Sequence, residues 1–169
     1  MKQVVAESLE ARTLFAAGYV DPGFGTLGTV SVPGPRGTPL GLFPSIDGGV
    51  FAVLNQTLSA GKVLRVRGDG SVDPKFSFKS GDAEALEQDP MTGRIALMNQ
   101  VAGGGGFQIT MLKHNGKIDP SFSEDGHVLL SDLGLTHPQI KFDRSGNLVL
   151  AELVANSTDL RIVRLTPSG

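Results

Sequence analysis

The sequence predicts an all-β protein, and within that class a β-propeller, from a phrase that occurs three times. The phrase is Asp-Pro-x-Phe, with spacings of 52 and 46 residues between its copies. This is the period range of propeller blades and other repeat arrays. Short apolar runs between glycine turns complete the pattern, which is typical of blades with four antiparallel strands. The residues that define the three copies are Asp21, Pro22 and Phe24; Asp73, Pro74 and Phe76; and Asp119, Pro120 and Phe122.

Two series of glycine turns recur with about the same period as the phrase. The interval from the inner glycine to the outer glycine of a unit is 21, 23 and 23 residues, so length variation is confined to one connection. These periods predict a lead-in segment or tail at residues 1–17 and a three-blade half-propeller at 18–169, with repeats at about 18–69, 70–115 and 116–169. The outer glycines are Gly18, Gly70, Gly116 and Gly169, and the inner ones are Gly49, Gly93 and Gly146.

Each unit contains several short runs of strand-forming residues separated by turn signals. In the first unit the expected strands are 28–32, 40–43, 50–54 and 63–67. In the second they are 85–87, 95–98 and 109–112, with a glycine loop at 103–106. In the third they are 126–130, 139–143, 147–151 and 160–165, with a polar link at 156–158.

The repeated phrase has a structural explanation and a functional one. Proline fixes φ and leaves no amide hydrogen unpaired, aspartate accepts hydrogen bonds from nearby backbone amides, and phenylalanine fills the layer between sheets. Alternatively, the three aspartates could form a ring of carboxylates that binds a cation. One aspartate per unit supplies fewer oxygen ligands than calcium requires, which favours the structural explanation.

Composition and charge exclude several classes of function. The 169-residue chain has a net charge of −2, so it carries no electrostatic footprint of a nucleic-acid-binding protein. No apolar run is long enough for a transmembrane helix, so we expect no membrane partner. The absence of cysteine excludes disulfides, thiolate catalysis and cysteine-based zinc sites.

Residues able to carry chemistry are few. The three histidines, His114, His127 and His137, lack metal-ligand spacing, no nucleophile-elbow sequence frames a serine, and no Gly-Lys-Ser/Thr follows the glycine loop. We therefore expect no catalytic residues, no cofactor and no metal site. An acidic stretch of Asp82, Glu84 and Glu87, followed by Asp89, is either a solvated face or a channel lining that binds a cation or a polar ligand.

Residues 18–169 resemble the Delta-60 repeat family of bacterial β-propeller-like proteins. The resemblance rests on residues 64–76, 112–122 and 21–28, which combine a leucine-rich strand, a turn with Asn or Asp and Gly, and an Asp-x-x-Phe segment. Ser77 and Ser123 stand where the family often has glycine. Residues 7–16 resemble the Leu-Glu-x-Arg-x-Leu-Leu leader of planctomycete-type exported proteins, with Ala11 in the usual place of proline. This resemblance implies an extracellular or cell-surface location; neither resemblance implies a catalytic set.

The two ends of the repeat array predict how it assembles. The array opens on an Asp-Pro-x-Phe turn and the strand that follows it, and it closes on the third strand of a blade. The opening strand is therefore the one that the last blade lacks. Three blades are fewer than the usual four to eight. We therefore expect a homodimer that forms a six-bladed propeller, in which the opening strand of each chain completes the last blade of the other. The alternative is a fragment of a longer propeller-repeat surface protein.

Two classes of function fit these features. The first is a non-enzymatic exported module whose propeller binds a partner or ligand that the sequence does not name. The second is a polysaccharide-active enzyme with its site in the channel. Sugar clefts usually stack sugar rings on aromatic side chains, and the chain has no Trp and a single tyrosine, Tyr19. With no clustered acid and base either, the sequence favours the non-enzymatic module.

Overall fold

The fold is taken from a computed structural model of the chain. It describes residues 20–32, 38–55, 61–81, 83–102, 106–131, 136–153 and 159–169. The lead-in segment at 1–17, Asp82, most of the glycine loop at 103–106 and the polar link at 156–158 lie outside the described residues.

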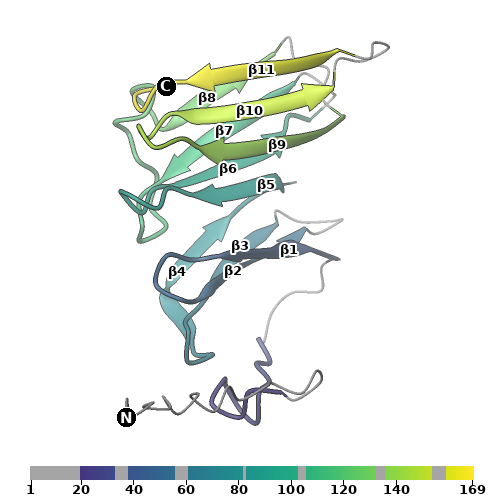
Figure 1. Ribbon diagram of the computed structural model, residues 1–169, viewed down its shortest axis with the longest axis vertical. Coiled ribbons are helices and arrows are strands. Elements are labelled where there is room, and N and C mark those ends of the chain that lie inside the picture. The colour runs from purple at the N-terminus through teal and green to yellow at the C-terminus, as the bar shows by residue number, and fades with distance from the viewer. Residues whose placement is uncertain are drawn as a thin grey trace, which may run out of the picture.

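Three antiparallel sheets follow one another along the chain and stack along the long axis of the molecule (Figure 1). The first sheet contains β1 (Thr38–Pro44), β2 (Val50–Asn55), β3 (Lys62–Val66) and β4 (Val72–Lys79). The second contains β5 (Ala83–Gln88), β6 (Ile95–Gln100), β7 (Phe107–Leu112) and β8 (His127–Leu130). The third contains β9 (Thr136–Phe142), β10 (Leu148–Leu153) and β11 (Leu160–Leu165).

The predicted all-β class is confirmed, since no helix occurs among the described residues. Strands were expected at residues 40–43, 50–54, 63–67, 85–87, 95–98, 109–112, 126–130, 139–143, 147–151 and 160–165, and all of these are found within two or three residues of their expected ends. The expected strand at 28–32 is different. Thr26 and Thr29 form an isolated bridge, and no other strand pairs with residues 30–32 in the described part of the chain.

The first and second sheets each take their strands from two sequence repeats. β4 lies after the outer glycine turn at Gly70, so it belongs to the second repeat by sequence but pairs with β3 of the first sheet. β8 pairs with β7 in the same way, across the turn at Gly116. The third sheet has three strands where the repeat pattern leads us to expect four.

The Asp-Pro-x-Phe phrase forms a bulge rather than a simple turn between strands in its second copy. Val72 pairs with Val66 and Ser77 pairs with Leu64, so residues 73–76 stand opposite Arg65 alone. In the third copy the phrase is a true turn between a bridge at Ile118 and the start of β8. The bulge suits this place because proline has no amide hydrogen to give to a ladder.

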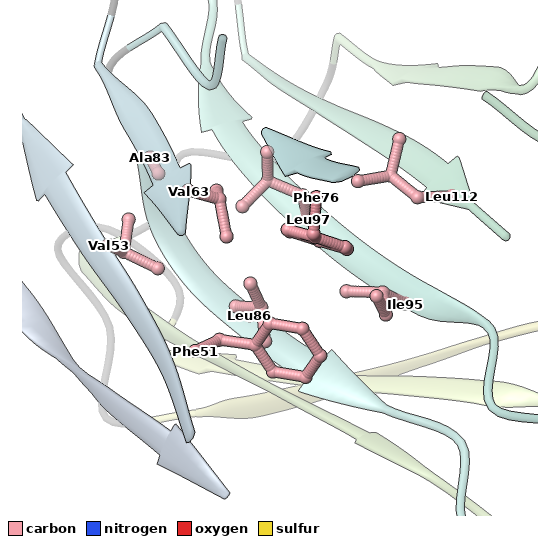
Figure 2. Close-up of a cluster of buried hydrophobic side chains, with 9 residues drawn as sticks. All are labelled: Phe51, Val53, Val63, Phe76, Ala83, Leu86, Ile95, Leu97 and Leu112. Atoms are coloured by element: carbon pink, nitrogen blue, oxygen red, sulfur yellow. The ribbon is translucent and has the colours of Figure 1, made fainter. Parts of the chain in front are cut away.

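Two apolar clusters hold the sheets together, one at each interface. The first lies between the first and second sheets and includes Phe51, Phe76 and Leu97 (Figure 2). The rings of Phe51 and Phe76 lie 5.3 Å apart, centroid to centroid. The second lies between the second and third sheets and includes Met98 and Phe122. Phe76 and Phe122 are both buried between sheets, which confirms the expected packing role of the phenylalanine.

Candidate interaction surface

The aspartates of the repeated phrase act on their own backbone. Asp21 accepts a hydrogen bond from the Gly23 amide at 2.8 Å, Asp73 from the Lys75 amide at 3.0 Å, and Asp119 from the Ser121 amide at 3.2 Å. Each is an Asx turn, in which the side chain mimics a backbone acceptor. The described residues contain no group of three or more His, Asp or Glu side chains that could hold a metal ion, and so no ring of these carboxylates.

Arg94 ties the third copy of the phrase to its surroundings. Its Nε lies 2.8 Å from Asp119 Oδ2, its Nη1 donates to the Pro167 carbonyl, and its guanidinium lies 5.8 Å from the centroid of the Phe122 ring. Burial acts to raise the pKa of Asp119, but the hydrogen bonds from Ser121 and the charge of Arg94 offset it, so the pKa lies below its usual value. The repeat pattern could not reveal Arg94, because the residues that come just before the equivalent strands β2 and β10 are Gly49 and Asn147.

The acidic stretch is only partly available for ligand binding. Glu84 is exposed on β5, while Asp82 lies outside the described residues. Glu87 accepts a hydrogen bond from Lys141 Nζ of β9 at 2.6 Å. Glu84, Glu87 and Lys141 border a pocket of about 250 Å³ where β5 lies beside β1 and β9. The lysine would compete with any cation for Glu87, and the sequence could not show this because the pair spans two sheets.

The described histidines belong to no group of three or more side chains that could hold a metal ion. His114 is exposed in the turn after β7, and His127 Nδ1 lies 3.0 Å from Thr110 Oγ1. The side chain of His137 lies outside the described residues.

The third sheet ends in an open edge and an open face. β11 pairs with β10 on one side, and no strand pairs with its other side in the described part of the chain. On the face that points away from the second sheet, Leu153, Leu160 and Ile162 are 54%, 61% and 63% exposed. A free edge beside an apolar face is the usual template for pairing with another chain.

The first sheet has an open face at the opposite end of the molecule. Val50, Ala52 and Leu54 are half-buried on the face turned away from the second sheet, and Leu42 beside them is 70% exposed. Residues 20–32 also lie at this end, far from β11 (Figure 1). The molecule therefore has one apolar sheet face at each end.

Residues 20–32 contact the first sheet in the same way as the segment before β8, the outer strand of the second sheet, contacts the third sheet. The Gly25 amide donates to the Asp69 carbonyl at 2.9 Å, just before the outer glycine Gly70. Two units later, the Ser123 amide donates to the Ser168 carbonyl at 2.7 Å, just before Gly169. Gly25 and Ser123 both follow the phenylalanine of the repeated phrase, so the two contacts are equivalent.

Comparison with known proteins adds no family to this description. No protein-family model matches the chain. No curated protein is significantly similar to it in sequence. The fold and surface together define an all-β protein of stacked antiparallel sheets with an open edge strand. Among the residues that the structure describes, none form a helix long and apolar enough to cross a membrane.

Proposed function

We propose that this chain is a non-catalytic, exported interaction module that pairs with a second copy of itself to close a six-bladed β-propeller. The observation that carries the proposal is the place of residues 20–32. They contact the turn at Gly70 as the outer strand of a preceding sheet would, although the described residues contain no such sheet. The third sheet of a partner, which lacks its outer strand, fits this vacant place.

The repeat register specifies how the two chains would pair. Residues 119–126 align with 21–28, so His127 and Val128 align with Thr29 and Val30. In the second sheet Ile109 pairs with Val128 and Thr110 pairs with His127. The equivalent positions of β11 are Ile162 and Val163. In the dimer Val30 of one chain therefore lies opposite Ile162 of the other.

Packing supports the same arrangement. Val30 Cγ2 lies close to Gly70, so the valine already points toward the first sheet of its own chain. Ile162 lies on the face of the third sheet that would cover that first sheet. Complete burial of an aliphatic side chain contributes about 1.5–3 kcal/mol. Leu153, Leu160 and Ile162 would all be covered, and two-fold symmetry forms the contact twice.

The non-enzymatic role and the exported location rest on other grounds. The described residues hold no group of three or more His, Asp and Glu side chains that could bind a metal, and Glu87 forms an ion pair with Lys141. The resemblance of residues 7–16 to exported-protein leaders supports a location outside the cell or on its surface. Fold alone does not decide activity, so these are separate parts of the proposal.

A disulfide cross-link between two chains tests the assembly. The chain has no cysteine, so the double variant Val30→Cys and Ile162→Cys introduces the only two thiols. Oxidation is expected to link two chains covalently, and light scattering of the unmodified protein is expected to give twice 17.7 kDa. The matched control is Val30→Cys with Leu129→Cys, because Leu129 is equally exposed but lies on β8, which is already paired.

Two results would overturn the dimer. A stable monomer at all concentrations would contradict it and would favour a fragment of a longer repeat protein. Equal cross-linking of the test and control pairs would show that the chains meet without the proposed register. Hydrolysis of a polysaccharide by the purified protein would overturn the non-enzymatic part alone.

A further inference from the structure

A pocket of about 590 Å³ lies between the first and second sheets, away from the open faces described above. β4 and the residues that follow it form one wall, and β6, β7 and β8 form the other. This size falls within the usual range for sites that bind small molecules. The side chains that border it include Phe78, Asn99, Gln108, Thr110, His127 and Leu129.

The wall from the second sheet is polar because four of its side chains share one face. Asn99 pairs with Gln108 across β6 and β7, and Thr110 pairs with His127 across β7 and β8. Leu97, two residues before Asn99, packs toward the first sheet, which fixes the direction of this face. The four polar residues therefore continue the surface of the apolar cluster outward into the pocket.

These side chains are partly held in place by their own hydrogen bonds. Asn99 Nδ2 donates to the Ser80 carbonyl, which joins the two walls. His127 Nδ1 and Thr110 Oγ1 lie 3.0 Å apart, so the imidazole is oriented and its other nitrogen is left for a further partner. Gln108 is half-buried and offers both a donor and an acceptor.

The equivalent place between the second and third sheets has different chemistry. There Glu152 and Arg161 occupy the positions of Asn99 and Gln108, and Val163 occupies that of Thr110. Glu152 Oε1 lies 3.4 Å from Arg161 Nε, and the glutamate is buried. An ion pair fills this second place, whereas the amides in the first border an open pocket.

We infer that the pocket between the first and second sheets binds a neutral sugar. Amide, hydroxyl and imidazole groups each donate and accept, as sugar hydroxyls require. The ring of Phe78, on the opposite wall, offers an apolar surface for the C–H face of a sugar ring. The four polar side chains of the second-sheet wall include no carboxylate, ammonium or guanidinium, which favours an uncharged ligand over an ionic one. Lys79 also borders the pocket, but it alternates with Phe78 along β4, so its side chain lies on the other face of that strand.

The binding is tested by titrating the full chain with glucose, galactose, mannose and N-acetylglucosamine, one at a time. Amide chemical shifts in ¹H–¹⁵N spectra report the position of binding. At least one sugar is expected to shift the amides of residues 78–81, 108–110 and 127–129 at concentrations up to about 10 mM. Gln108→Ala is expected to lower the affinity for that sugar by about tenfold, the effect of losing one hydrogen bond in a partly buried site.

Gln139→Ala is the matched control, because Gln139 is an exposed glutamine on β9 that borders the smaller pocket near Glu87. It is expected to leave sugar binding unchanged. The inference is overturned if none of the four sugars shifts the pocket amides. It is also overturned if Gln139→Ala weakens binding while Gln108→Ala does not. The pocket lies within one chain, so this result is independent of the dimer test.

Discussion

At the scale of single residues, the outer glycines are the points where successive units meet. Gly70, Gly116 and Gly169 have φ of 82°, 80° and 99°, a region that other residues adopt at a cost. A side chain added at Gly70 would meet Gly25, one at Gly116 would meet Phe76, and one at Gly169 would meet Ser123. Each glycine thus serves both the turn and the close approach of the preceding copy of the phrase.

Alanine substitutions at Gly116 and Gly48 separate the cost of the positive φ from the cost of the contact with Phe76. Gly116→Ala adds a Cβ that would lie 3.1 Å from the Phe76 ring, whereas Gly48 has nearly the same φ, 82°, and no atom within 4 Å of an added Cβ. Gly48→Ala is expected to cost about 1–2 kcal/mol of unfolding free energy for the backbone alone. Gly116→Ala is expected to cost more, measured by urea unfolding. Equal losses would mean that the Phe76 contact contributes nothing.

Asp143 is expected to make stability depend on pH in the acid range. Hydrogen bonds from the Asn147 side chain, from backbone amides and from nearby Arg164 lower its pKa from 3.8 to about 2. Since the folded state favours the ionised form, this contribution is present above pH 3.8 and is lost as pH falls toward 2. The unfolding free energies of Asp143→Asn and of the unmodified protein, measured with urea, should therefore converge as the pH falls over that range. A gap that stays constant would contradict the assignment.

At the scale of elements, the phenylalanine of each Asp-Pro-x-Phe copy joins an outer strand to the next sheet. Phe122 is fully buried between the second and third sheets, whereas Phe24 is only half-buried. Residues 20–32 contact the first sheet as the segment around Phe122 contacts the third, but the described residues include no counterpart of the second sheet, which covers Phe122 from the other side. The same side chain at the same repeat position therefore has two environments.

Truncation of these two phenylalanines is expected to affect different properties. Phe122→Ala should lower the unfolding free energy by about 3–5 kcal/mol, the usual cost for a buried aromatic side chain. Phe24→Ala should cost much less at low protein concentration, where the chain is a monomer, but should weaken the proposed dimer. Calorimetry at several concentrations, with light scattering, measures both. Equal effects on the monomer would show that Phe24 is already packed.

At the scale of the whole molecule, the three sheets form an array with two unlike ends. One end carries the apolar face of the first sheet with residues 20–32, and the other carries the free edge of β11 (Figure 1). Two ends that complement each other join head to tail, and such contacts close into a ring when the rotation allows it. The proposed dimer is the smallest ring that satisfies both ends.

The repeat pattern of the sequence by itself determined the all-β class, the position of almost every strand, the glycine turns and the burial of Phe76 and Phe122. These features depend on local φ preferences and on residues near one another in a unit, which the sequence displays directly. Only the tertiary structure decided that β4 joins the first sheet, that Glu87 pairs with Lys141 and that Asn99, Gln108 and His127 border a pocket. Lys141 and Glu87 are 54 residues apart, and such pairings arise from how the sheets stack, which no local pattern specifies.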